Sequence, residues 1–396
     1  MLRLEQVFIN YIHDMQKKYM LCLVDLTLKS YHLYYFCKKS FCKLFKYMEG
    51  LIEMTYIIRS AGIEITNKCN FRCKHCFNRS GEHNRNDEMT DSQILDIFQS
   101  IAKLQPDSMC ICGGEPMLRK NLVYQIGKLV KTINSNISLN MVSNGSLIGD
   151  TEAKMLKDSG LDLLQISLDG ASDETHNWIR NNNYSFKKAI EAIKLAKKYN
   201  LQVSVACTPS QKNYNEIFDV IKLCTDLGVS TFRIQPLMIM GRGTQLLDFT
   251  LSDEQYFKLS KKIMESASSK YKSINIEWGD PLQHLEAIVE GNESLKFKDL
   301  QINAYGDIMF SPYIPIMLGN LKKHSIIEYF DRGLEEIYTI PIIRNAAMQM
   351  KEWNNMELNQ INKIFPKIGF DKNINFDLIE KENNDTELLN ALETLK

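Results

Sequence analysis

The chain has 396 residues, of which 44% are hydrophobic and 24% are charged, and its 48 basic residues balance its 48 acidic ones. This composition excludes secreted, fibrous and disordered proteins and predicts a globular protein with a sizeable core. A formal net charge of zero argues against broad electrostatic capture of nucleic acid, so no nucleic-acid partner is expected.

The sequence carries no sign of export or membrane insertion. No apolar run reaches the length of a membrane span, and the N-terminus lacks the apolar core and cleavage site of a secretory signal. We therefore expect a cytoplasmic protein. In that compartment, its ten cysteines are expected to be thiols or metal ligands instead of disulfide partners.

Residues 1–59 are predicted to form a basic, aromatic N-terminal extension. Residues 11–48 are rich in lysine and aromatic side chains, which suits a basic amphipathic surface. A helical extension packed on the main domain, or translation from too early a start with Met54 as the true first residue, are the simpler interpretations.

Short β-rich runs alternate with helical patterns through residues 60–245. Thr90 and Gln93 form a capping box before the first helix. Strands are predicted at 63–65, 108–112, 137–143, 162–168, 201–207 and 231–235, and amphipathic helices at 94–104, 122–133, 151–158, 186–196 and 217–227. Repeated βα units predict an α/β fold, a partial (β/α)6 TIM-like barrel, with its active site at the C-terminal ends of the strands.

Three cysteines follow the first predicted strand within eight residues: Cys69, Cys73 and Cys76. Clustered thiolates bind soft metals, and iron–sulfur clusters are held by cysteine. A structural zinc site would need a fourth ligand, and no further cysteine follows at zinc-ribbon spacing. Three ligands on a four-iron cube leave one iron open, which suits catalysis, so these cysteines are the predicted metal ligands.

The pattern Cys69-x3-Cys73-x2-Cys76 after a first strand resembles the cluster motif of radical S-adenosylmethionine (radical SAM) enzymes. A second segment resembles the turn with which that family receives the amino group of SAM: Gly113, Gly114, Glu115 and Pro116. The resemblance covers residues 60 to 240 and implies one 4Fe-4S cluster and SAM as cofactors. It also implies reductive cleavage of SAM to a 5′-deoxyadenosyl radical, with an electron donor such as flavodoxin or ferredoxin.

By the same resemblance, later strand ends contribute further contacts to SAM. These residues carry groups that hydrogen-bond a ribose or a carboxylate: Ser143, Asn144, Ser167, Asp169 and Arg180. His75 lies where the family commonly has an aromatic residue and is expected to stack on adenine. Gln235 is expected to border the adenine, and His176 to be structural.

Residues 246–370 resemble a degenerate form of the SPASM or twitch extension, which binds auxiliary clusters in many radical SAM enzymes. A hairpin around 302–310 and a helix near 325–338 predict an α+β extension of the barrel. No cysteine follows Cys224, so auxiliary clusters with the usual ligands are excluded by the sequence. Residues 371–396 are acidic and rich in asparagine, and a mobile tail is expected there.

The resemblance to peptide-maturing members predicts an oxidoreductase-like enzyme that modifies a peptide or protein, such as a ribosomally synthesised peptide, by epimerisation or crosslinking. Two alternatives stay open: a small-molecule precursor in cofactor or antibiotic biosynthesis, and a non-catalytic iron–sulfur scaffold. Epimerisation would require a hydrogen donor. Cys207, at the end of the fifth predicted strand, is the first candidate, and Cys112, beside the SAM turn, is the next.

Overall fold

A computed structural model describes residues 56–82, 85–267, 271–279, 296–340, 343–344 and 374–380. The chain divides into two compact units, Met1–Thr55 and Tyr56–Lys396, and all the described residues belong to the second. The predictions for the N-terminal extension therefore lie almost entirely outside the described residues.

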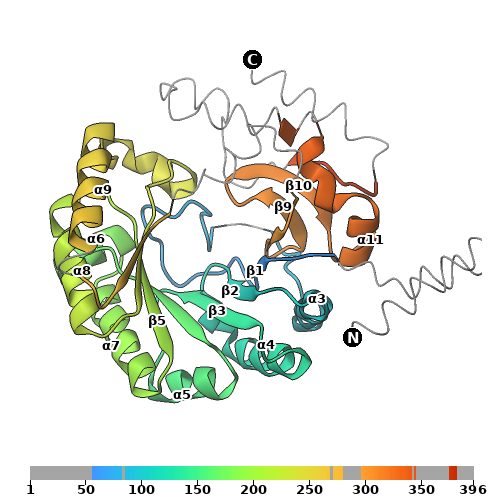
Figure 1. Cartoon of the computed structure of the whole chain (residues 1–396), viewed down its shortest axis with the longest axis horizontal. Coiled ribbons are helices and arrows are strands. Elements are labelled where there is room, and N and C mark those ends of the chain that lie inside the picture. The colour runs from blue at the N-terminus through green and yellow to red at the C-terminus, as the bar shows by residue number, and fades with distance from the viewer. Residues whose placement is uncertain are drawn as a thin grey trace, which may run out of the picture. The chain divides into compact units, whose positions relative to one another are not determined.

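Eleven described strands form one sheet in the order β11-β10-β9-β8-β1-β2-β3-β4-β5-β6-β7 (Figure 1). Strands β1 to β6 are parallel neighbours: β1 (Ser60–Glu64), β2 (Ser108–Cys112), β3 (Ser138–Ser143), β4 (Leu163–Ser167), β5 (Gln202–Cys207) and β6 (Thr231–Ile234). The helices between them are α3 (Asp91–Lys103), α4 (Lys120–Ile133), α5 (Asp150–Asp158), α6 (Asp173–Arg180), α7 (Ser185–Lys198) and α8 (Ile217–Asp226). The predicted partial barrel is confirmed.

The helices pack on one face of this sheet through the apolar positions that the sequence pattern identified. On α3, Ile94, Phe98 and Ile101 are completely buried, as are Met109 and Ile111 on β2. The capping box of Thr90 and Gln93 starts α3 as predicted. Figure 1 shows these helices on the convex side of the strands, which leaves the concave side for the active site.

Further elements extend both edges of the six-stranded sheet. Helix α9 (Asp253–Ala267) leads to β7 (Asn275–Trp278), which pairs in parallel with β6. At the other edge, β8 (Asp299–Ile302) pairs in parallel with β1. The sequence reasoning did not predict α6, α9 or β7, because α6 and β7 are short and α9 lies beyond the βα pattern from which the helices were assigned.

The C-terminal extension continues the barrel sheet beyond β8. Strand β9 (Asp307–Ser311) pairs antiparallel with β8 and with β10 (Ile314–Asn320), and α11 (Ile326–Asp331) follows. These elements match the predicted hairpin and helix. The expectation of a mobile tail is corrected at its start, because β11 (Ile374–Asn375) pairs with β10, and the apolar side chains of Phe376 and Leu378 are 2% exposed.

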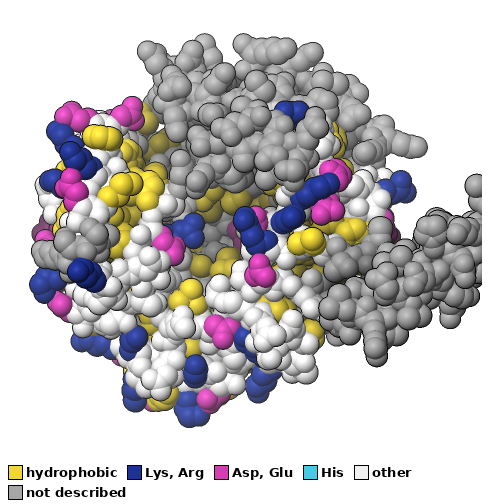
Figure 2. Space-filling model, in the orientation of Figure 1, with side chains coloured by type: hydrophobic (Ala, Val, Ile, Leu, Met, Phe, Trp, Pro, Cys, Tyr) yellow, Lys and Arg dark blue, Asp and Glu magenta, His cyan; other side chains and the backbone are white. Residues whose placement is uncertain are grey.

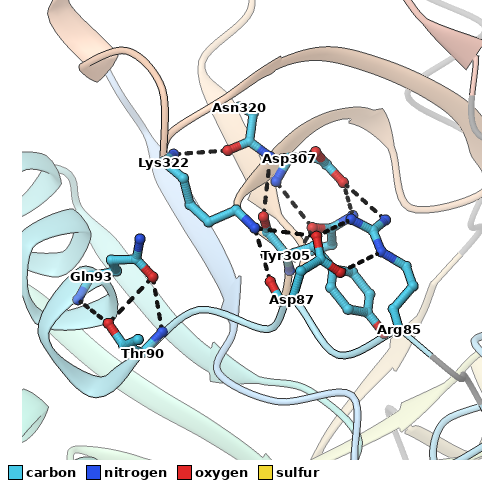
Figure 3. A network of polar contacts seen from close by, with 9 residues as sticks. Arg85, Asp87, Thr90, Gln93, Tyr305, Asp307, Asn320 and Lys322 are labelled. Atoms are coloured by element: carbon cyan, nitrogen blue, oxygen red, sulfur yellow. Dashed lines mark hydrogen bonds and ion pairs between the residues drawn. The ribbon is translucent and has the colours of Figure 1, made fainter.

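A polar network joins the C-terminal extension to the segment before α3 (Figure 3). Arg85 makes two hydrogen bonds to Asp87, of 2.9 and 2.8 Å, and its guanidinium lies 3.8 Å from the centre of the Tyr305 ring. Lys322 donates a hydrogen bond to the backbone oxygen of Asp87 over 2.8 Å. The Asp307 carboxylate lies 3.7 Å from the Arg85 guanidinium. The extension is therefore held against the chain that leads out of the cysteine loop.

The surface agrees with the balanced charge of the chain. Figure 2 shows basic and acidic side chains interspersed over the described part of this face. None of the helices in the described ranges is both long enough and apolar enough to cross a membrane.

Candidate active site

The three predicted cluster ligands lie in the loop that follows β1. All three are free thiols, and Cys73 is 8% exposed, whereas Cys69 and Cys76 are half-buried. A turn in which the Cys76 amide donates to the Cys73 carbonyl over 3.3 Å shapes the loop. Burial raises the pKa of Cys69 to about 11, and the nearby Cys73 and Cys76 add to this rise.

This thiol arrangement fits an iron–sulfur cube. Within the described ranges, no three His, Cys, Asp or Glu side chains converge on a position for a single metal ion. A cube does not need such convergence, because each thiolate binds a different iron. Three neighbouring thiols on one loop are therefore suited to a cube, and binding would displace their protons.

Gly113 and Gly114 lie in close contact with the backbone at the start of the cysteine loop. The Gly114 amide donates to the Thr66 carbonyl over 2.8 Å. A Cβ atom on Gly114 would lie 2.2 Å from the backbone oxygen of Lys68, and one on Gly113, whose φ is +144°, would lie 2.4 Å from that of Thr66. Only glycine permits this approach, so the turn supports the segment that enters Cys69.

Glu115 is completely buried and bonds to protein groups. Its carboxylate accepts hydrogen bonds from the Ser143 hydroxyl over 2.8 Å, the Asn144 amide over 2.9 Å and the Met117 amide over 3.1 Å. Burial raises the pKa of Glu115. The carboxylate joins the turn to the end of β3, and Pro116 begins the short helix that follows. A direct contact of Glu115 or Ser143 with SAM stays a prediction.

Asn144 connects the end of β3 to the cysteine loop. Its side-chain amide donates to Asn70 over 3.0 Å, and its side-chain oxygen accepts from the Ser146 amide over 2.9 Å. Asn70 lies between the first two cysteines in sequence. Asn144 is thus placed beside the loop by contacts within the protein, and its predicted contact with SAM stays a prediction.

Asp169 is the buried centre of a charged group at the end of β4. One carboxylate oxygen lies 2.6 Å from Arg180 Nε and 3.7 Å from His75 Nε2, and the other accepts from the Thr208 amide over 2.9 Å. Burial favours a raised pKa for Asp169, but Arg180, His75 and His176 lower it below its ordinary value. The carboxylate is therefore ionised. His176 accepts from the Asp169 amide over 3.0 Å, as expected of a structural residue.

Arg180 connects this group to the cysteine loop. Its Nη1 atom lies 3.8 Å from Cys73 Sγ, and its side chain is 11% exposed. Burial raises the pKa of Cys73, while Arg180 opposes the rise and so favours the thiolate. The structure thus places Arg180 between Asp169 and Cys73, and the predicted pairing with the SAM carboxylate stays a prediction.

Two further residues predicted to contact SAM are His75, in the cysteine loop, and Ser167, at the end of β4. Burial lowers the pKa of His75 to about 4, so its imidazole is neutral at pH 7. Its Nδ1 atom is buried and lacks a hydrogen-bond partner among the described residues, which suits a polar group of a bound cofactor. Ser167 is half-buried at the last position of β4, on the face opposite Ile166.

Sequence reasoning missed Arg242, which braces the cysteine loop from the other side. Arg242 is 8% exposed, its amide donates to the Cys76 carbonyl over 2.9 Å, and its Nε donates to the Cys73 carbonyl over 2.8 Å. A Cβ atom on Gly241 would lie 2.3 Å from the Phe77 carbonyl. Two glycines around an arginine after the sixth strand were the sequence signal.

Tyr313, in the C-terminal extension, contacts residues of the barrel at the end of β6 and in the cysteine loop. It lies in the turn between β9 and β10, where auxiliary-cluster enzymes are expected to carry a cysteine. Its hydroxyl accepts a 2.5 Å hydrogen bond from Gln235, which follows β6, and its ring centre lies 5.4 Å from that of Phe77. This contact brings the extension over the cysteine loop.

The expectation for Cys207 is corrected. It lies at the end of β5 as predicted, but it is 1% exposed and pairs in register with Ile234, which is completely buried. Because neighbouring residues in register share a face of the sheet, Cys207 points into the core beneath the helices. Burial raises its pKa well above the ordinary value. The thiol therefore does not line the concave face.

Comparison with known proteins agrees with this geometry. Residues 63–224, which include the cysteine loop and the glycine turn, match the family described as Radical SAM superfamily. This part of the barrel matches a radical SAM domain. Such domains use a 4Fe-4S cluster and SAM, which are the two cofactors expected from the sequence.

The chain is similar to curated proteins that include a peptide-maturation protein and a heme synthase. It is 28% identical over 247 residues to "Sporulation killing factor maturation protein SkfB" of Bacillus subtilis (strain 168), covering 60% of this chain and 57% of that protein. It is 23% identical over 303 residues to "AdoMet-dependent heme synthase" of Methanosarcina barkeri, covering 72% of this chain and 85% of that protein. The chain thus spans little more than half of SkfB.

Solved structures share the fold. Streptococcus suis SuiB bound to precursor peptide SuiA has a TM-score of 0.58 at 14% identity, covering 83% of this chain and 79% of SuiB. Native anSMEcpe with bound AdoMet and Kp18Cys peptide has a TM-score of 0.56 at 17% identity, covering 85% and 97%. At these identities the likeness shows the fold alone.

Proposed function

We propose that this radical SAM protein is an enzyme that abstracts hydrogen from a peptide or protein substrate and matures a ribosomally synthesised peptide by epimerisation or crosslinking. The observation that carries this proposal is the similarity to SkfB, whose name describes a maturation protein, through 60% of this chain. The shared fold with SuiB, which was crystallised with its precursor peptide, is consistent with a mouth that admits a peptide.

We assign the cofactor contacts from the site described above. Cys69, Cys73 and Cys76 would hold the cluster, and the turn at Gly113 and Gly114 would lie against SAM. When bound, these cofactors supply a 5′-deoxyadenosyl radical. The protein would hold the three thiols in position and exclude side reactions. Arg180 would offset the negative charge of the Cys73 thiolate.

The substrate is proposed to lie between the barrel mouth and the C-terminal extension. The contact between Tyr313 and Gln235 supports this position, because it narrows the mouth on the side of β6. We infer that residues 246–370 are a SPASM-like extension that has kept its shape without auxiliary clusters, and that the barrel ends near residue 245.

A small-molecule substrate is the second candidate. The similarity to the heme synthase of Methanosarcina barkeri extends over 85% of that protein, further than the similarity to SkfB extends over its own length. We also propose a one-electron donor such as flavodoxin or ferredoxin, and a cytoplasmic location, where such donors and reduced thiols are found.

Anaerobic reconstitution with iron, sulfide, SAM and reductant tests the proposal, with 5′-deoxyadenosine measured by chromatography. Each reaction is run with peptides encoded beside the gene and, separately, with tetrapyrrole precursors. Faster deoxyadenosine formation and a modified peptide mass support peptide maturation. Stimulation by the tetrapyrrole alone would support the second candidate. The variant with Cys69, Cys73 and Cys76 all changed to Ala should form none.

A further inference from the structure

Two thiols lie in contact on strand β2, directly before the glycine turn. The Sγ atoms of Cys110 and Cys112 are 3.3 Å apart. Because the two residues are two positions apart in a strand, their side chains share one face of the sheet. Met109 and Ile111 occupy the other face and are completely buried under the helices. The thiol pair therefore lies on the concave face of the barrel.

This face is polar and partly accessible. Both cysteines are half-buried instead of fully covered. In register, Cys112 pairs with Glu64 of β1, and Cys110 pairs with Asn140 of β3, and neighbours in register share a face. The pair is thus set among polar side chains, one residue from the turn at Gly113.

Their chemistry suits a hydrogen donor more than a nucleophile. The contact with Cys110, together with burial, raises the pKa of Cys112 well above its ordinary value. Its sulfur therefore keeps its hydrogen at neutral pH, and a hydrogen-atom donor must have an S–H bond. Among the seven cysteines of the described ranges, Cys207 and Cys224 are 1% and 0% exposed. Neither of them reaches the concave face.

We propose that Cys110 and Cys112 form a redox-active thiol pair that returns a hydrogen atom to the substrate radical. This inference rests on the proposed radical function and deepens it, because it favours reactions whose product regains hydrogen, such as epimerisation, over crosslinking. Cys112 is the direct donor, since it is nearer to the C-terminal end of β2.

The S–H bond of Cys112 breaks as a C–H bond forms on the substrate, which leaves a thiyl radical. The thiyl sulfur bonds to Cys110, whose proton passes to solvent, and the surplus electron reduces an oxidised one-electron carrier protein. The pair ends as a disulfide. An external dithiol then reduces this disulfide to two thiols and is itself oxidised to a disulfide. For this bond the two sulfur atoms must move from 3.3 Å apart to about 2.0 Å apart.

A substrate-free reaction in deuterated water tests the position of the pair. Exchanged thiols carry deuterium, so the reconstituted protein with SAM and reductant should form singly deuterated 5′-deoxyadenosine. Cys112→Ala and Cys110→Ala/Cys112→Ala should lose at least half of that deuterium, whereas Cys224→Ala should match the wild type. Equal deuterium in the wild type and the double variant overturns the proposal. If no deoxyadenosine forms, the radical function itself fails.

Thiol mapping supplies a readout that does not depend on turnover. The cluster-loaded full-length protein is treated briefly with diamide, denatured, alkylated with iodoacetamide and digested for mass spectrometry. We expect a disulfide between Cys110 and Cys112, with Cys224 alkylated. Cys112→Ser should leave Cys110 alkylated. Recovery of both Cys110 and Cys112 as free thiols in the wild type would overturn the pair, whatever the outcome with SAM.

Discussion

Arg242 Nε donates a 2.8 Å hydrogen bond to the backbone oxygen of Cys73, the most buried of the three predicted cluster ligands, from 169 residues away in the sequence. The same guanidinium bonds to Glu82 over 2.7 Å, and the Arg242 amide bonds to the Cys76 carbonyl. One buried residue therefore fixes the backbone of two predicted ligands in a loop that has no helix or strand of its own.

Changing Arg242 to Gln should weaken cluster loading. The variant removes the charged donor of the 2.8 Å hydrogen bond to the Cys73 carbonyl, which keeps only the 3.3 Å bond from the Cys76 amide. Loss of a buried hydrogen bond to a charged group costs about 1–3 kcal/mol. We expect iron per chain after reconstitution to fall by at least half, with a lower melting temperature of the cluster-free protein. Arg332→Gln, at an exposed position, is the matched control. Wild-type iron content in Arg242→Gln would show that the loop is fixed by other contacts.

Adding a single methyl group at Gly114 should also act through the loop. In Gly114→Ala, the new carbon would lie 2.2 Å from the Lys68 oxygen, so the backbone before Cys69 must shift. We expect a loss of about 1–3 kcal/mol in unfolding free energy, typical of overpacking, together with reduced iron content. In Gly149→Ala the nearest atom is the end of the flexible Glu152 side chain, at 3.0 Å. Equal effects in both variants would contradict a specific role for the turn.

The network around Asp87 should stabilise the fold in a pH-dependent way. Hydrogen bonding to Arg85, together with Lys322, holds the pKa of Asp87 well below its usual range. A depressed pKa in the folded state contributes stability above the unfolded value of about 3.9, and that stability is lost as pH falls through the folded value. The Asp87 side chain is 53% exposed, so screening limits the gain to under about 1 kcal/mol.

Urea unfolding of the wild type and Asp87→Asn at pH 7 and at progressively lower pH measures this contribution. We expect the Asp87→Asn variant to be less stable than the wild type at pH 7, and the difference to shrink below pH of about 4. A difference that stays constant over this range would mean that the carboxylate charge is not involved. High salt should reduce the difference at pH 7, because the pair is exposed.

Much of the barrel could be predicted from the sequence because its signals are local. Alternating apolar residues located β1 to β6, and the spacing of Cys69, Cys73 and Cys76 located the site. The orientation of side chains was harder: the last residue of β5 was expected to face the active site, yet the sheet register turns Cys207 into the core. Local pattern does not say which face of a strand is concave.

The contacts of Glu115 and Arg242 were not predicted, because they join segments that are distant in the sequence. Glu115 follows the glycine turn, and its contact with SAM stays a prediction. The sequence does not reveal that groups at the end of β3 donate hydrogen bonds to its carboxylate. The contact of Arg242 with the cysteine loop likewise depends on how the chain returns after β6. These relationships arise from packing of whole elements, so they became visible only in the folded structure.

Tyr313 should affect the ratio of 5′-deoxyadenosine formed to product formed. Tyr313→Phe loses the hydrogen bond from Gln235 but keeps the ring beside Phe77, whereas Tyr313→Ala loses both contacts. If the mouth is the substrate site, Tyr313→Ala should raise the ratio of 5′-deoxyadenosine to product several-fold, with Tyr313→Phe intermediate. Substrate-free SAM cleavage should change little in either variant, since the three cysteines and the glycine turn are untouched. Tyr184→Ala, at a residue 74% exposed, is the control. An unchanged ratio in Tyr313→Ala would place the substrate elsewhere.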